Sequence, residues 1–146
     1  MLFAESSAIV TAFSVDEPDH PRMRSMLLAR SGPVIASELV RLEFVSAVSA
    51  AGRAGRIGDP ASLVAQFDGE CAPGGRLKLL ALRGQATLAR AASLVQQHRL
   101  RSLDAIHLAV ALDDGLPLAI GEPLAFVTRD ARQAEAARAL GFTVMS

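Results

Sequence analysis

Short apolar runs that alternate with longer helical patterns constrain the fold of this chain more than any other feature. The runs predict strands over residues 2–4, 32–37, 76–82, 124–128 and 142–145. Helical patterns of apolar residues fill most of the sequence between them. Short apolar strands joined through helices are typical of a sheet that is buried on both faces. The sequence therefore predicts an α/β fold of three layers, α/β/α, with a mostly parallel central sheet.

Length and hydropathy set the organisation of the chain. Its 146 residues suffice for one domain with a real core but not for two, and the 51% of hydrophobic residues favours a packed globule over disorder. We expect a single domain over residues 1–146. No apolar run reaches the roughly 18 residues that a membrane span needs, and the opening MLFAESSAIV lacks the basic segment of a signal peptide. We therefore expect a cytoplasmic protein without a membrane segment.

The charge and the cysteine count exclude several classes of function. Fifteen basic residues balance fifteen acidic ones, which argues against binding of nucleic acid through bulk positive charge but leaves a local basic groove open. Lys78 is the only lysine, so phosphate contacts would come from arginines. Cys71 is the only cysteine, which excludes an internal disulfide and a cysteine-rich zinc site. We expect Cys71 to be a half-buried helix residue rather than a nucleophile.

Two acidic residues follow predicted strands directly. Glu5 comes after the strand at 2–4, and Asp130 comes after the strand at 124–128. Asp130 also suits the N-cap of the next helix, whereas glutamate is a poor cap, so Ser6 or Ser7 is the better candidate to cap the helix after Glu5. In open parallel sheets, sites form outside the carboxyl ends of the strands. Glu5 and Asp130 are therefore expected at the same rim of the sheet.

Glu43 lies on a helix that is expected to begin at Ser37, and nothing on its own helix can pair with it. Its neighbours three and four residues away are Leu39, Val40, Ser46 and Ala47. An ionised carboxylate on such a face needs a partner from elsewhere, because an unpaired buried charge is very costly.

Asp104 opens the segment RSLDAIHLAVAL (101–112), which is otherwise almost entirely apolar. Ser102 is the expected cap of this helix, so Asp104 falls in the first turn, where an aspartate also complements the helix dipole. His107 is one turn further on. A general base is conceivable there, but a histidine packed in the core with one nitrogen satisfied is the favoured interpretation.

Convergence of these acids predicts a metal site. Carboxylates that meet in one pocket repel one another unless they are protonated or bound to cations. Mg²⁺ and Mn²⁺ prefer oxygen ligands, and this chain has few histidines and one cysteine to offer instead. We therefore expect one Mg²⁺ or Mn²⁺ pocket lined by Glu5, Glu43, Asp104 and Asp130.

Four segments give the chain a resemblance to a known family. They are FAESSAIVTAF (3–13), SELVRLEFVSAVSAAGRAGRI (37–57), RSLDAIHLAVAL (101–112) and FVTRDARQAEAARALGFTV (126–144). Over essentially its whole length the sequence resembles the PIN-domain ribonucleases, in particular the VapC toxins of bacterial toxin–antitoxin pairs. The resemblance implies a metal-dependent endoribonuclease. It makes the four acids catalytic metal ligands, with Ser7 and Thr128 supporting the pocket by hydrogen bonds.

The resemblance also implies partners. The substrates of the family are RNAs, commonly tRNA, and its members form homodimers that pair with a small VapB-like antitoxin, which blocks the acidic groove. Candidates for contacts with the RNA backbone are Arg53, Arg56 and Arg129. The chain has no Trp or Tyr, and its six Phe fall mostly in core patterns, so the sequence gives no sign of aromatic stacking on bases.

Glu5 departs from the family pattern, in which the first acid is ordinarily aspartate. Its side chain is one methylene longer, so either the metal lies further from the strand or the side chain folds back. This difference motivates an alternative function: a catalytically weakened PIN domain that acts mainly as an antitoxin-binding partner.

Other residues and other classes of function compete with these assignments. Asp113, Asp114 and Glu122 lie in a segment resembling an inserted loop and compete with Asp130 for the role of fourth acid. A phosphoacceptor receiver domain would need a lysine after a late strand, whereas Lys78 falls in an early one. Neither G-x-G-x-x-G nor G-x-x-x-x-G-K occurs, which argues against dinucleotide and P-loop binding.

Overall fold

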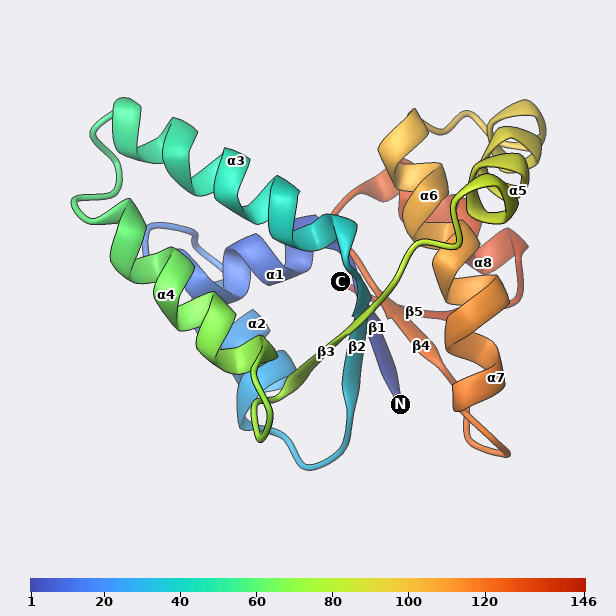
Figure 1. Cartoon of the computed structure of the whole chain (residues 1–146), viewed down its shortest axis with the longest axis horizontal. Coiled ribbons are helices and arrows are strands. Elements are labelled where there is room, and N and C mark those ends of the chain that lie inside the picture. Colours follow the sequence, from blue (N-terminus) through green and yellow to red (C-terminus); the bar gives the residue numbers. More distant parts are fainter.

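A five-stranded sheet divides the computed structural model, which describes residues 1–146, into two helical layers (Figure 1). All neighbouring strands pair in parallel, in the order β3-β2-β1-β4-β5. Every predicted strand is present within two residues at either end. The strands are β1 (Leu2–Ala4), β2 (Val34–Ser37), β3 (Leu77–Leu80), β4 (Ala125–Val127) and β5 (Thr143–Met145). The three-layer α/β/α prediction is confirmed, and the sheet is entirely parallel.

Helices cover both faces of the sheet. One layer, at the left of Figure 1, contains α1 (Ser6–Phe13), α2 (His20–Arg24) with a π-helical turn η1 (Ser25–Ala29), α3 (Leu39–Arg53) and α4 (Pro60–Cys71). The other contains α5 (Gln85–Gln97), α6 (Ser102–Val110), the π-helical turn η2 (Ala111–Gly115), α7 (Leu116–Leu118) and α8 (Ala131–Ala139). None of these helices is both long and apolar enough to cross a membrane.

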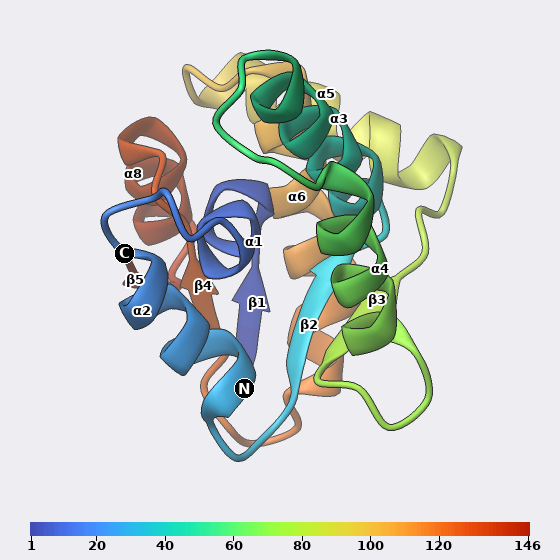
Figure 2. The same ribbon diagram turned by 90° about the vertical axis from the view of Figure 1, so that its left-hand side faces the viewer.

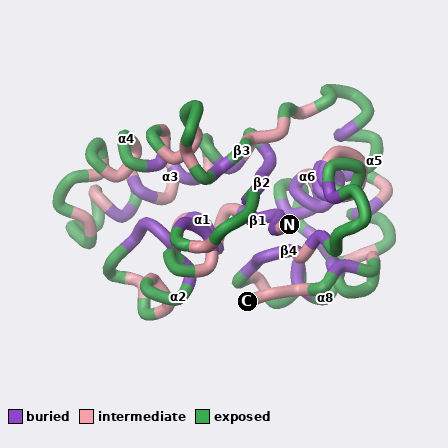
Figure 3. Tube along the Cα trace, turned by 90° about the horizontal axis from the view of Figure 1, so that it is seen from below, coloured by how far each residue is buried: buried purple, intermediate pink, exposed green.

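The two faces of the strands enter separate cores, because successive side chains on a strand point to opposite faces. Leu2 and Ala4 pack with the helices of the first layer, whereas Phe3 between them packs with those of the second. Buried residues accordingly lie along the strands and on the helix faces turned toward them (Figure 3). All six phenylalanines are buried in one core or the other, as the sequence pattern predicted.

The strand order creates a switch point beside β1. From β1 the chain moves outward through β2 and β3, and it then returns to β4 on the other side of β1. Phe3 pairs with Phe126 at this junction, and their rings stack with centroids 5.4 Å apart. Figure 2 shows β1 and β2 pointing toward the end of the molecule where α3 and α6 lie. Connections that leave neighbouring strands in opposite directions form a crevice at the carboxyl ends, where ligands bind in this class of fold.

Residues 113–118 are helical rather than part of an inserted loop. Turn η2 and helix α7 prolong α6 across the sheet. Pro117 is tolerated because it lies in the first turn of α7, where a backbone N–H has no partner within the helix. The loop is thereby confined to the few residues before β4.

Gly115 generates a testable prediction about how this extended helix packs. A Cβ atom there would lie 3.1 Å from the Leu124 side chain and 3.3 Å from the ring of Phe3. We expect Gly115→Val to lower the free energy of unfolding by about 1–3 kcal/mol, since the core must shift to accept the new side chain. Gly69→Ala in α4 is the control: its Cβ meets nothing within 4 Å. This control should raise stability by roughly 0.5–1 kcal/mol. Denaturant unfolding of both variants measures the difference, and equal stabilities would contradict the packing described.

Candidate functional site

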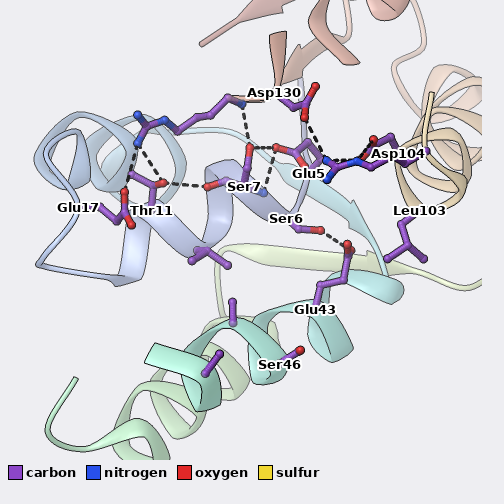
Figure 4. Close-up of a pocket in the computed structure, with 15 residues that line it drawn as sticks. Glu5, Ser6, Ser7, Thr11, Glu17, Glu43, Ser46, Leu103, Asp104 and Asp130 are labelled. Atoms are coloured by element: carbon purple, nitrogen blue, oxygen red, sulfur yellow. Dashed lines mark hydrogen bonds and ion pairs between the residues drawn. The ribbon is translucent and has the colours of Figure 1, made fainter. Parts of the chain in front are cut away.

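All four acids singled out by the sequence line one pocket at the carboxyl end of the sheet (Figure 4). The pocket has a volume of about 720 Å³ and lies between α1, α3, the start of α6 and the segment that joins β4 to α8. Glu5 follows β1, Glu43 projects from α3, Asp104 is in the first turn of α6 and Asp130 precedes α8. The chain therefore brings together carboxylates that are far apart in sequence.

The carboxylate of Glu5 folds back onto the helix that follows it. It accepts hydrogen bonds from the backbone N–H groups of Ser7 (3.0 Å) and Ala8 (3.2 Å) and from the Ser7 hydroxyl. The expectation that Ser6 or Ser7 caps α1 is wrong, because Glu5 itself is the N-cap. The longer side chain folds back far enough for its carboxylate to accept the two amides that a shorter cap side chain normally serves. Of the two outcomes expected for the longer side chain, the structure shows the folded-back one.

Glu43 obtains its partners from other elements, as the sequence required. Its Oε2 accepts the Ser6 hydroxyl and lies 2.5 Å from Nε2 of His107. Burial works to raise the pKa of Glu43, but the hydrogen bonds from His107 and Ser6 together with the charge of Arg101 bring the pKa below its ordinary value. Glu43 is thus held as a carboxylate at neutral pH.

His107 is only 1% exposed, which agrees with the expected core histidine. Its Nε2 nevertheless faces Glu43, and lies 2.9 Å from the Ser6 hydroxyl. Its Nδ1 has no hydrogen-bond partner. A proton on Nε2 lets the ring donate a hydrogen bond to Glu43. His107 therefore holds the carboxylate of Glu43 in place through this hydrogen bond.

Arg101 joins the remaining two acids. Its guanidinium bonds Asp104 through Nε (2.9 Å) and a terminal nitrogen (3.4 Å), and that same nitrogen lies 3.1 Å from Asp130. Arg101 is also the residue before the first turn of α6, so Ser102 is not the cap that the sequence predicted. Arg101 was not predicted to line the pocket, although its position three residues before Asp104 places the two side chains within reach of each other.

Asp130 caps α8, as predicted, through bonds from the backbone N–H groups of Arg132 (2.9 Å) and Gln133 (3.0 Å). Thr128 accepts the Asp130 N–H (3.0 Å), and its hydroxyl donates to Gln133 (2.9 Å). The Gln133 amide in turn donates to the backbone oxygen of Asp104 (3.2 Å). The sequence signal for Gln133 was the D-x-x-Q spacing of a helix start, although its side chain reaches Thr128 and Asp104 instead of the cap.

Of the three arginines proposed for RNA contacts, only Arg129 lines the pocket. Its backbone N–H donates to the Ser7 hydroxyl (2.9 Å), and its guanidinium pairs with Asp19 (2.8 Å). Arg56 lies outside the pocket and pairs with Asp16 at 2.5 Å, and Arg53 is exposed in the last turn of α3.

The competing acids and the remaining reactive side chains lie elsewhere. Asp113 and Asp114 pair with Arg90 and Arg83, and Glu122 is 3.8 Å from the N-terminal amino group. Lys78 is exposed on the edge strand β3. Cys71 is partly buried at the end of α4, as expected, and burial followed by the charge of Asp68 raises its pKa to about 11. A thiol with this pKa is protonated at neutral pH and is a poor nucleophile.

The pocket contains the ligand types that a divalent cation needs, but not yet their arrangement. Four carboxylates are the hard oxygen donors that Mg²⁺ and Mn²⁺ prefer. No three acidic, histidine or cysteine side chains, however, stand close enough to hold one ion. The guanidinium of Arg101 lies between Asp104 and Asp130 instead. A metal would therefore require a rearrangement of these side chains.

Comparison with known proteins identifies the class. The family model of the PIN domain matches residues 2–139, so the chain belongs to the PIN domain family. Among solved structures, the chain is similar to the crystal structure of Mycobacterium tuberculosis VapC20, a toxin that cleaves the sarcin–ricin loop. The two share 16% sequence identity and a TM-score of 0.68, over 98% of this chain and 97% of that one. No curated protein matches the chain in sequence.

Gln133 yields a prediction about the support of the pocket. Gln133→Met keeps the volume but removes both side-chain bonds, so we expect the free energy of unfolding to fall by about 1–3 kcal/mol. Gln97→Met is the matched control, because Gln97 is exposed and bonds only to Ser93 on its own helix. Thermal unfolding should separate the two variants. Equal stability of Gln133→Met and the parent chain would show that this hydrogen-bonded link has no energetic role.

Proposed function

We propose that this protein is a metal-dependent endoribonuclease, the toxin of a VapBC-type pair, which hydrolyses RNA phosphodiester bonds at the acidic pocket. The observation that carries the proposal is the convergence of four carboxylates at the switch point of a PIN-domain sheet. Such a cluster is costly to maintain for structural reasons alone, because the charges repel one another. RNA cleavage by VapC20, a protein of the same fold, supports the choice of substrate class.

Glu5, Glu43, Asp104 and Asp130 are the proposed ligands of one or two Mg²⁺ or Mn²⁺ ions. A divalent cation bound there would activate a water molecule and stabilise the charge that develops on the phosphodiester. The chain's own residues hold the ligands in position. His107 and Ser6 hold Glu43, and the α8 amides and Thr128 hold the segment of Asp130.

The shape of the pocket supports an RNA strand as the ligand. Beyond the acids, small residues of α3 (Ser46, Ala47 and Ala50) face Val10 and Thr11 of α1. These short side chains leave room between the two helices. Arg129 lines the same pocket and presents a planar guanidinium that suits a phosphate. We assign the backbone contact in the pocket to Arg129, and leave Arg53 and Arg56 as contacts outside it.

The partners follow from the same proposal. A small VapB-like antitoxin would inhibit the protein by covering the acidic pocket, which is open at the surface between α1 and α3. We also propose that the protein is a homodimer, for which exposed leucines on α3, α5 and α6 (Leu42, Leu88 and Leu103) supply apolar surface. Since its RNA substrates reside in the cytoplasm, we propose that the protein acts there.

Asp104→Asn tests the catalytic role of the pocket. With Mn²⁺ or Mg²⁺ present, we expect the rate of cleavage of tRNA and of a sarcin–ricin-loop RNA to fall about 100-fold or more. Mutation of a residue that only orients a metal ligand already lowers activity or metal affinity about 10–100-fold. Asp113→Asn is the control, because Asp113 pairs with Arg90 outside the pocket. Chelation of the metal should have the same effect as Asp104→Asn. Full activity of Asp104→Asn would refute a catalytic role for this pocket.

The folded-back carboxylate of Glu5 favours a second candidate, a weakened nuclease that serves mainly to bind an antitoxin. Glu5→Asp distinguishes the two functions, since aspartate is a good N-cap and restores the usual first acid of the family. Cleavage that appears only in Glu5→Asp would establish the binding function for the natural chain. Cleavage by the natural chain that Glu5→Asp does not increase would exclude it. Both proteins are assayed on the same RNAs with equal Mn²⁺.

A further inference from the structure

Arg101 is the one arginine that contacts any of the four proposed metal ligands, Glu5, Glu43, Asp104 and Asp130. It bonds Asp104 and Asp130 directly. Its charge also contributes to the lowered pKa of Glu43. The pKa of Arg101 itself is raised, first by the hydrogen bond with Asp104 and to a smaller extent by the charge of Glu5. One guanidinium therefore interacts with all four carboxylates, two by contact and two through space.

The bridge occupies the oxygens that a metal would use. Both oxygens of Asp104 accept from Arg101, at 2.9 and 3.4 Å. One oxygen of Asp130 accepts from Arg101 at 3.1 Å, and the other accepts the two amides at the start of α8. A divalent cation between the two aspartates would lie against the positive guanidinium, which like-charge repulsion disfavours in a partly buried pocket.

Of the three partners, Arg101 has by far the most exposed side chain. Its side chain is 63% exposed, whereas those of Asp104 and Asp130 are 12% and 22% exposed. Its backbone is extended, just outside α6, and makes no side-chain cap. The two aspartates are fixed by the helix starts and by Gln133. Departure of the arginine side chain toward solvent thus leaves the acids in place.

We propose that Arg101 is an internal counter-cation that occupies the metal-binding oxygens when no metal is bound. The Arg101 bridge and a bound divalent cation therefore exclude each other. The inference rests on the proposed metal site and adds a means by which the chain sets its own metal affinity. It explains why no three acids are gathered around one point while Arg101 lies among them. In the metal-free protein the guanidinium relieves the repulsion between Asp104 and Asp130.

Arg101→Gln tests this exclusion by direct measurement of Mn²⁺ binding to the whole protein, without RNA, by titration calorimetry and by the electron paramagnetic resonance signal of free Mn²⁺. We expect the variant to bind Mn²⁺ about tenfold or more tightly, the factor that corresponds to one charge-assisted hydrogen bond no longer broken. In the absence of metal it should melt at a lower temperature than the parent chain. A residue with a merely structural role would not change the two properties in opposite directions.

Arg132→Gln is the matched control. It removes one positive charge next to Asp130, but its exposed side chain makes no ion pair. Its Mn²⁺ affinity should stay within about twofold of the parent value, because exposed charges are screened. Arg101→Lys, which keeps the charge but loses the two-pronged bridge, should bind Mn²⁺ with intermediate affinity and provides a second variant should Arg101→Gln fold poorly.

The outcomes separate this inference from the nuclease function. Arg101 variants that bind Mn²⁺ no more tightly than Arg132→Gln, or a complete lack of Mn²⁺ binding in all the proteins, would overturn the inference. If the Arg101 variants bind Mn²⁺ no more tightly than Arg132→Gln but the natural chain still cleaves RNA, the nuclease function stands and the exclusion between Arg101 and the metal does not. If Arg101→Gln binds Mn²⁺ more tightly but the natural chain cleaves no RNA, the exclusion between Arg101 and the metal is supported and the proposed nuclease function is overturned.

Discussion

Repulsion among four carboxylates in one partly buried pocket is the constraint on which the rest of this structure depends. Each acid is compensated by groups of the protein itself: helix amides for Glu5, His107 and Ser6 for Glu43, and Arg101 for both Asp104 and Asp130. The compensation comes from three separate helix starts and one buried ring, so the whole carboxyl edge of the sheet takes part in it. The partners of the acids, and not the acids alone, define the chemistry that this pocket can perform.

Three helices begin at the pocket, and this follows from the fold. The residues before the first turns of α1, α6 and α8 are Glu5, Arg101 and Asp130. Helix N-termini carry partial positive charge and unpaired N–H groups, which favour anions. Parallel strands with helical connections place such termini at one edge of the sheet, and the switch point beside β1 opens a crevice there. The fold thus stabilises an acidic site before any metal ion is considered.

The sequence predicted the parts of this arrangement that depend on local pattern. The apolar runs located all five strands, and Glu43 was recognised because no residue on its own helix could pair with it. Contacts between distant segments left no such signal. The bridge from Arg101 to Asp130 spans 29 residues, and Gln133 reaches Asp104 across the same distance. Glu5 was not expected to cap α1, because glutamate is a poor cap on average. That preference reflects the average reach of the side chain and not the contacts available in this pocket. The segment 113–123 looked like a loop because of its glycines and prolines, but Asp113 is held to Arg90 of α5 and Asp114 to Arg83 just before α5 by ion pairs.

Because every acid already has a protein partner, folding and metal binding are separable in this molecule. Small metal domains whose ligands have no other partners fold only when the ion is present. Here the ion must instead compete with a guanidinium and with backbone amides for the same oxygens. Such competition weakens affinity but keeps the ligands ordered, and a site that is ordered in advance loses less entropy when it binds. The arginine three residues before Asp104 therefore links the stability of the empty pocket to the strength with which it takes up a cation.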